Sequence, residues 1–131
     1  MATDKQIILV VDDDEDILFQ MKMNLAETDF EIILAGSEKE ARKILEETQP
    51  TLAILDLMME HRDSGFVLSH HIKKLNPEIK VILCTAVTSE TGMEFETSAP
   101  EERSWVKADT ILSKPVRKDQ ILREIDALIG A

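Results

Sequence analysis

Side chains that can bind a cation or a phosphate follow four short apolar segments of this chain. Asp12 and Asp13 come directly after the segment IILVV, and Asp56 comes directly after LAIL. Thr85 follows VILC, and Lys114 follows ILS. If these segments are neighbouring strands of one sheet, three carboxylates, a hydroxyl and an ammonium group meet at one place.

Asp12 and Asp13 open a run of five acids, residues 12 to 16. Two carboxylates about 4 Å apart repel each other by roughly 4 kcal/mol at an effective dielectric constant of 20. A hard divalent cation offsets this repulsion, and Mg²⁺ typically takes one or two carboxylates and keeps water and phosphate oxygens as its other ligands. We therefore interpret Asp12 and Asp13 as a Mg²⁺ site. Residues 14 to 16 are expected only to begin a helix, where acids complement the helix dipole.

The segments that carry these residues alternate with helical patterns. β-branched runs typical of strands buried on both faces occur at residues 7–11, 31–35, 51–55, 80–84 and 110–113. Apolar residues at helical spacing occur at residues 17–25, 41–45, 68–75 and 121–128. Ser37 and Glu40 have the spacing of a capping box at the start of the second helix. Alternating strands and helices predict an α/β fold, a doubly wound five-stranded parallel sheet with helices on both faces.

Such a sheet brings the chemically active residues together, because ligands bind beyond the carboxyl ends of parallel strands. Asp56 is then a candidate nucleophile that accepts a phosphoryl group as an acyl phosphate. Lys114 can neutralise one phosphoryl oxygen, and Thr85 can donate a hydrogen bond to another. Each residue alone has a simple structural explanation. Their joint position at the strand ends favours a site for phosphoryl transfer.

Four motifs support a family resemblance, namely VVDD at 10–13, ILDLMM at 54–59, LCTA at 83–86 and ILSKP at 111–115. In this order they resemble the receiver domain of two-component response regulators. The resemblance covers nearly the whole chain, so we interpret residues 1–131 as a single receiver domain of the stand-alone type. It implies a flavodoxin-like sheet with the strand order 2-1-3-4-5.

The resemblance also implies roles for individual residues. It makes Asp56 the phosphoacceptor. The Mg²⁺ ligands that it implies are Asp13, Asp56 and the backbone carbonyl of Met58, with Asp12 acting through water. The residues that would sense the phosphoryl group are Thr85 and Lys114.

The partners follow from the same resemblance. The phosphoryl group would come from a phosphohistidine of a sensor histidine kinase or of a histidine phosphotransfer protein, in a Mg²⁺-dependent reaction. With no effector domain attached, the change would be read by another protein. We expect no enzymatic activity beyond self-phosphorylation from a phosphodonor and autodephosphorylation.

The chain departs from the family pattern in three places. Receivers usually carry proline four residues after the acceptor, where this chain has Glu60, and the glycine that follows, Gly65, comes one residue late. Ile111 stands where many receivers have an aromatic residue that switches position. The stretch before the last motif is several residues longer than usual, and we expect residues 87–97 to form an extended loop beside the site.

Composition limits the classes of function. The 131 residues are 44% apolar with four Gly and four Pro, which suits one compact domain rather than a disordered chain. The net charge of −11 would repel phosphate backbones and anionic lipid, so we expect no binding to nucleic acid or membranes. We expect neither a signal peptide nor a membrane span, and hence a cytoplasmic protein. The single Cys84 is expected to be a buried small hydrophobe.

Two alternative functions remain beside this interpretation. A degenerate receiver would bind partners without accepting phosphate, although all five site residues are present here. A phosphatase of the haloacid dehalogenase type also forms an aspartyl phosphate with Mg²⁺, but it needs Thr or Val where this chain has Asp16, and the chain has no room for a substrate cap. A dinucleotide-binding domain would need a Gly-rich turn after the first strand, and the first glycine is Gly36.

Overall fold

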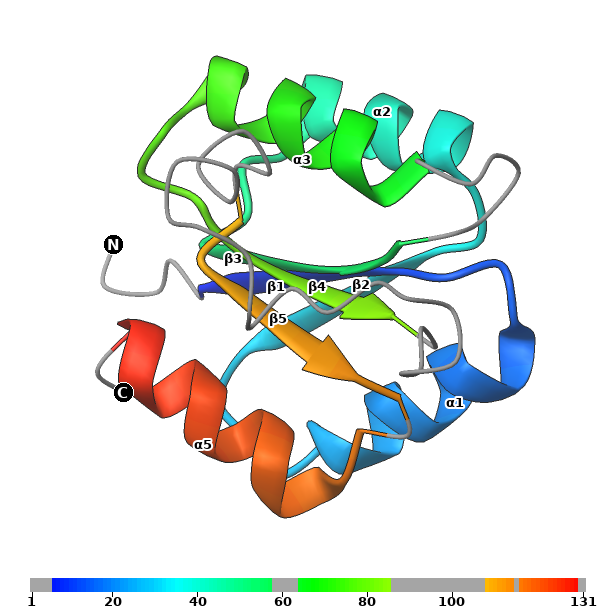
Figure 1. Ribbon diagram of the computed structural model, residues 1–131, viewed down its shortest axis with the longest axis vertical. Helices are drawn as coiled ribbons and strands as arrows, with labels where there is room; N and C mark the ends of the chain where they lie inside the picture. The colour runs from blue at the N-terminus through cyan, green and yellow to red at the C-terminus, as the bar shows by residue number, and fades with distance from the viewer. Residues whose placement is uncertain (1–5, 58–63, 86–107, 115, 130–131) are drawn as a thin grey trace.

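The computed structural model describes residues 6–57, 64–85, 108–114 and 116–129. Strands and helices alternate along these parts of the chain up to residue 85 (Figure 1). In chain order the elements are β1 (Ile7–Val11), α1 (Glu15–Asn24), β2 (Glu31–Ala35), α2 (Glu38–Glu47), β3 (Leu52–Asp56), α3 (Ser64–Leu75), β4 (Lys80–Thr85), β5 (Thr110–Ser113) and α5 (Lys118–Ile129). The sequence-based expectations for Met58 and for the loop 87–97 lie outside the described residues.

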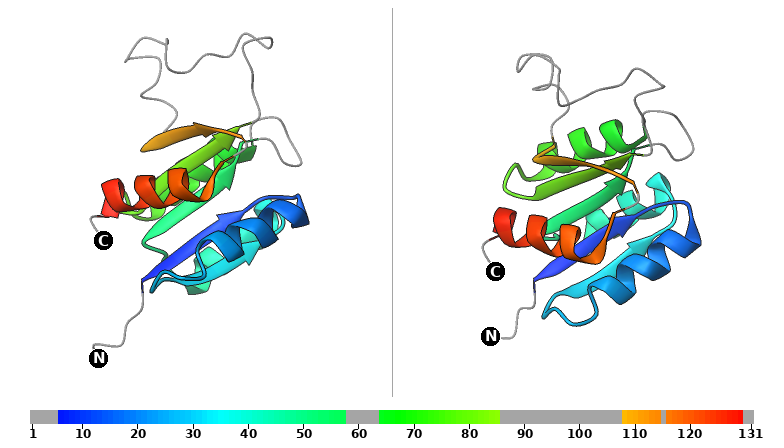
Figure 2. Two further views of the ribbon diagram at one scale, coloured as in Figure 1. Left: turned by 90° about the horizontal axis from the view of Figure 1, so that it is seen from below. Right: turned by 60° about the horizontal axis from the view of Figure 1, so that its bottom comes forward.

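The five strands form one parallel sheet in the order β2-β1-β3-β4-β5, which confirms the predicted α/β fold. Helices α2 and α3 cover one face of the sheet, and α1 and α5 cover the other (Figures 1 and 2). The third strand lies one residue later than predicted, and the fourth extends one residue further. Asp56 and Thr85 are the last residues of their strands.

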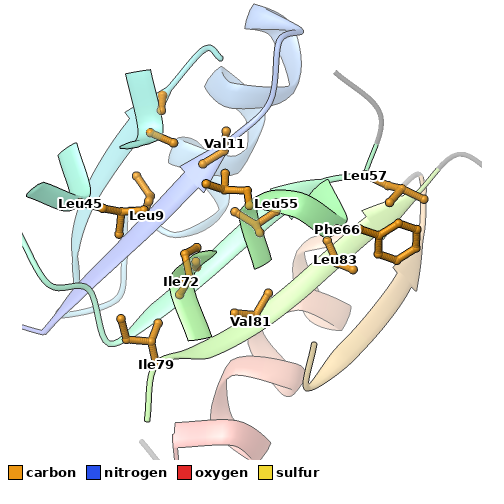
Figure 3. Packing of buried hydrophobic residues seen from close by; sticks show 14 residues of the cluster. Leu9, Val11, Leu45, Leu55, Leu57, Phe66, Ile72, Ile79, Val81 and Leu83 are labelled. Atoms are coloured by element: carbon orange, nitrogen blue, oxygen red, sulfur yellow. The ribbon is translucent and has the colours of Figure 1, made fainter. Parts of the chain in front are cut away.

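Side chains alternate between the two faces of the sheet, as the period of a strand requires, and so build two apolar layers. The layer under α2 and α3 contains Leu9, Leu55 and Leu83 (Figure 3). The layer under α1 and α5 contains Ile8 and Ile54. Burying one such side chain fully contributes about 1.5–3 kcal/mol. The two layers together hold the strand ends, and the site that they carry, in a fixed arrangement.

The prediction that all strands are buried on both faces is wrong for the two edge strands. β1, β3 and β4 are buried along almost their whole length. In β2, Glu31 is exposed and the next three residues are only partly buried, and in β5 Ser113 is exposed. An edge strand has a neighbour on one side only, so β-branched composition alone did not distinguish the edge strands from the central ones.

Polar side chains begin the helices as the sequence indicates. Asp14 caps α1, because its Oδ1 accepts a hydrogen bond from the amide of Asp16 at 2.9 Å. Ser37 Oγ accepts from the amide of Glu40 at 3.0 Å. The carboxylate of Glu40 accepts in return from the amide of Gly36, at 2.7 Å, rather than from the amide of the cap residue itself. Both caps satisfy amide groups that the first turn of a helix leaves without a partner.

The start of β5 is fastened to its neighbours by Lys73 of α3. Its Nζ donates to the carbonyl of Ile79 at 2.6 Å and to Oδ2 of Asp109 at 2.8 Å. The same carboxylate oxygen accepts from the amide of Val81 at 2.8 Å. These bonds tie α3, β4 and the residue before β5 together. None of the described helices is long and apolar enough to cross a membrane.

Candidate functional site

Three carboxylates meet at the carboxyl ends of β1 and β3, the two strands at which the sheet order reverses. One ligand atom from each of Asp12, Asp13 and Asp56 lies within 4.8 Å of the others. Asp12 and Asp56 are buried, at 3% and 7% exposure, whereas Asp13 is exposed. The structure thus brings together the three acids that the sequence assigned to one site.

The local backbone explains why two consecutive acids take up different positions. The amide of Asp12 donates to the carbonyl of Ala35 at 3.1 Å, so pairing with β2 continues one residue beyond β1. Asp12 Oδ1 accepts from the amide of Asp14 at 2.9 Å, and Asp14 begins α1. Asp13 lies at the bend between the strand and the helix. It therefore faces solvent while Asp12 faces the protein.

Lys114 connects the carboxylates of the first and third strands. Its Nζ lies 2.9 Å from Oδ1 of Asp56 and 3.1 Å from Oδ2 of Asp12. Its backbone amide donates to the carbonyl of Thr85 at 2.8 Å, which fixes the residue just after β5 against the end of β4. Thr85 is itself buried, and Ser113 is its register partner. Four strand ends, of β1, β3, β4 and β5, therefore contribute to one rim.

Burial and charge act in opposite directions on the pKa values of this pair. Burial raises the pKa of the Asp56 carboxyl, the hydrogen bond from Lys114 lowers it, and the charge of Asp12 raises it, so that the net pKa lies above the ordinary 3.8. Burial acts to lower the pKa of Lys114, but its hydrogen bonds to Asp56 and Asp12 outweigh burial and raise that pKa. Lys114 is therefore positively charged, and Asp56 is a more basic carboxylate than an exposed one.

The donor set fits a hard divalent cation. All three candidate ligands are carboxylates, and one ammonium against three carboxylates leaves two negative charges. Oxygen ligands with an excess of negative charge are what Mg²⁺ and Ca²⁺ take in proteins. The exposure of Asp13 leaves one side of the site open to water and to a phosphate.

The sequence analysis named two further residues, Cys84 and Gly65, without placing them at the site. Cys84 is buried, as predicted, and burial raises the pKa of its thiol to about 12. However, it also pairs in register with Asp56 and lines a cavity of about 50 Å³ with Asp12, Asp56 and Lys114. Its position directly before Thr85 could have indicated this. Gly65 is the second, since its amide donates to the carbonyl of Leu57 at 2.7 Å, directly beside the acceptor.

Residues 8–126 match the family model described as the response regulator receiver domain. The chain belongs to this family. The receiver is 28% identical to the chemotaxis protein CheY of Halobacterium salinarum over 128 residues, which cover 97% of this chain and 98% of that protein. The acidic pocket of Asp12, Asp13 and Asp56 is consistent with a phosphoryl-accepting response regulator.

Other relatives of the receiver are longer proteins. It is 30% identical to the transcriptional regulatory protein GlrR of Escherichia coli, covering 91% of this chain but 25% of that protein. It is 27% identical to the Bacillus subtilis regulatory protein PhoP, covering 93% of this chain and 48% of that one. The chain thus spans about a quarter to a half of these two regulators.

Solved structures show the same fold. A CheY-like receiver domain protein from Methanospirillum hungatei aligns with a TM-score of 0.78 at 25% identity, covering 97% of this chain and 96% of that one. A receiver domain protein from Clostridium thermocellum aligns with a TM-score of 0.77 at 27% identity, covering 95% of this chain and 94% of that one.

Receivers of this family are not enzymes in the ordinary sense, and membership of the family implies a histidine kinase as partner in a two-component system.

Proposed function

We propose that this receiver accepts a phosphoryl group on Asp56 from the phosphohistidine of a sensor histidine kinase or a histidine phosphotransfer protein, in a Mg²⁺-dependent reaction. The observation that supports this most directly is the position of Lys114, which contacts the carboxylates of both Asp12 and Asp56. An ammonium group within hydrogen-bond distance of the acceptor can stabilise the charge of a transferring phosphoryl group.

In the proposed reaction an oxygen of the Asp56 carboxylate forms a bond to phosphorus. The phosphorus–nitrogen bond of the phosphohistidine breaks, and the imidazole nitrogen keeps the electron pair. The ionised carboxylate of Asp56 supplies the electron pair for the new bond. Lys114 then neutralises a phosphoryl oxygen, and the Thr85 hydroxyl donates to another.

The residues that would hold the cation are Asp12, Asp13 and Asp56, with the backbone carbonyl of Met58 proposed as a further ligand from the family resemblance. Bound Mg²⁺ would supply the neutralisation of charge on the phosphoryl oxygens that the single ammonium of Lys114 leaves incomplete. The carboxylate of Asp13, which faces solvent, is suited to meet an incoming hydrated ion. Asp12 is already engaged with Lys114 and with the amide of Asp14, which suits it to act through water.

We further propose that residues 1–131 work as one stand-alone receiver in the cytoplasm, whose phosphorylated form is read by a separate protein. The match to CheY, which covers 98% of that protein's length, supports reading by a separate protein. The net charge of −11 argues against nucleic acid and anionic membranes as its direct partners.

The decisive experiment is the intact mass of the protein after incubation with acetyl phosphate and Mg²⁺. The parent should gain the mass of one phosphoryl group, and Asp56→Asn should gain none. Asp13→Asn should need more Mg²⁺ for the same labelling, whereas Asp16→Asn, in the same acidic run but outside the triad, should behave like the parent. Labelling of Asp56→Asn would show that another residue accepts the phosphoryl group. A parent that stays unlabelled would favour the degenerate receiver, a protein-binding module without phosphorylation.

A further inference from the structure

The first turn of α3 lies against the backbone of the proposed phosphoacceptor. A Cβ atom built on Gly65 would lie 2.6 Å from the carbonyl oxygen of Asp56 and 2.6 Å from Cα of Leu57. Ordinary van der Waals contacts of a Cβ atom begin at 3.4 Å. Any residue other than glycine at position 65 would therefore need a displacement of about 0.8 Å, and the opposing atoms are backbone, which cannot rotate away.

Hydrogen bonds hold the same stretch of backbone on both sides. The amide of Leu57 donates to the carbonyl of Cys84 at 2.8 Å, which anchors the end of β3 to β4. The carbonyl of Leu57 accepts from the amide of Gly65 at 2.7 Å, which anchors it to α3. Leu57, the residue after the acceptor, is thus hydrogen-bonded both to β4 and to α3.

Neither α3 nor the end of β3 can shift easily. The side chain of Phe66 packs with Leu57 and Leu83 in the layer under α2 and α3 (Figure 3), and Leu68 of the same helix has no exposed surface. Interiors packed this closely resist displacement. A side chain at position 65 would therefore push part of the displacement onto the end of β3, where Asp56 is the last residue.

We infer that Gly65 is a positioning residue for the acceptor: its missing side chain lets α3 hold Asp56 where its carboxylate meets Lys114 and the other acids. The inference rests on the proposed function, in which Asp56 receives the phosphoryl group. The contact between Asp56 Oδ1 and Lys114 Nζ is 2.9 Å long. Even half of the displacement of about 0.8 Å, where it acts on Asp56 along this contact, takes the distance beyond the ordinary range of about 2.7–3.2 Å.

The test is Gly65→Ala, with Gly36→Ala as a matched control, since a Cβ at Gly36 would meet only Oε1 of Glu40 at an ordinary 3.5 Å. Three quantities are measured at a temperature at which circular dichroism shows every variant folded: the initial rate of labelling at saturating acetyl phosphate and Mg²⁺, the Kd for Mg²⁺ by calorimetry without phosphodonor, and the melting temperature. Gly65→Ala should lose at least about tenfold in labelling rate, because misplacement of a reacting group by about 1 Å can cost up to a hundredfold. Its Kd for Mg²⁺ should rise several-fold, and Gly36→Ala should keep both values within about twofold.

Phe66→Ala separates positioning from loss of stability. It removes packing from the same turn of α3 without placing an atom against Asp56, so it should lower the melting temperature yet label like the parent while folded. A folded Gly65→Ala with the parental rate and Kd would overturn the inference, as would a folded Phe66→Ala that loses as much rate. If Gly65→Ala does not fold even at low temperature, the contact serves only the fold, and this outcome would also overturn the inference. If the parent itself is not labelled, the proposed function fails, and the Kd for Mg²⁺ still decides the role of Gly65.

Discussion

Asp56 is an ionisable group that the fold buries beside another acid, and this has a consequence for stability. Burial first, and then the charge of Asp12, raise its pKa above 3.8 despite the hydrogen bond from Lys114. The stability that this carboxyl contributes is fully present below its unfolded pKa, where it is neutral in both states. It is lost as the pH rises through the folded pKa, because the folded protein then holds a charge that the unfolded chain would hold more easily.

We therefore predict that Asp56→Asn melts at a higher temperature than the parent at pH 7 in buffer without divalent cations. The difference should shrink as the pH falls towards and below 3.8, where the parent carboxyl becomes neutral as well. Thermal melts followed by circular dichroism across this pH range would show it. The control is Asp29→Asn, at an exposed position outside the site, and its melting temperature should differ little from that of the parent. A lower melting temperature for Asp56→Asn at pH 7 would contradict the prediction.

Cys84 is the second residue whose environment sets its chemistry. Burial raises the pKa of its thiol to about 12, and only 4% of the residue is exposed. Because the thiolate is the reactive form, we predict that iodoacetamide at pH 8 leaves the folded protein unmodified. Mass spectrometry should show complete alkylation only after unfolding in urea. Rapid modification of the folded protein would show that the cavity beside Asp56 opens to solvent.

At the scale of elements, Lys73 ties α3 to the two last strands of the sheet. Its side chain is 17% exposed and that of Asp109 is 26% exposed, so both are largely shielded. We predict that Lys73→Met lowers the free energy of unfolding by about 1–3 kcal/mol, because a shielded carboxylate and the carbonyl of Ile79 lose their donor. Urea unfolding measures this. The neighbouring Lys74 is exposed, so Lys74→Met is the control and should change stability by less than about 0.5 kcal/mol.

The sequence predicts those features of the helices and strands that depend on residues close together in the chain. The strand positions, the cap at Ser37 and the helical spacing up to Leu75 follow from short-range patterns, and the structure confirms them to within one residue. The convergence of Asp12 and Asp56 was also predictable, because parallel strands bring their carboxyl ends together. The low burial of the edge strands was not predictable from residue type, since it depends on the strand order.

The contacts that the sequence could not predict are those that depend on how separate helices and strands pack against each other. Nothing in the spacing of Gly65 indicates that its Cα approaches the carbonyl of Asp56. The ion pairs of Lys114 with both acids likewise depend on side-chain directions at the end of β5. Sequence reasoning gave Lys114 a role towards phosphate, and the structure adds that it contacts the carboxylates themselves.

At the scale of the whole molecule, a net charge of −11 on 131 residues disfavours the compact state through self-repulsion. Salt should therefore stabilise the protein by screening. We predict that Mg²⁺ raises the melting temperature more than NaCl does at equal ionic strength, because binding to the folded state adds about 2.7 kcal/mol at a concentration of 100 Kd. Melts of the parent and of Asp13→Asn measure this. The difference between the two salts should be smaller for the variant than for the parent, and an equal response in the parent would mean that no specific site binds Mg²⁺.

Asp56 borders residues on both sides of the sheet, and this limits how the protein can evolve. The side chain of Asp56 lines a cavity with Cys84 and Met21 on the side of α1, whereas its backbone carbonyl lies against Gly65 on the side of α3. Substitutions under opposite faces of the sheet, which never touch each other, therefore act on the same acceptor. Their effects on phosphorylation should be epistatic, with a change at Cys84 tolerated or not according to the residue at position 65. Two related receivers could then differ so far in core sequence that transferring one apolar layer alone from one protein to the other abolishes phosphorylation.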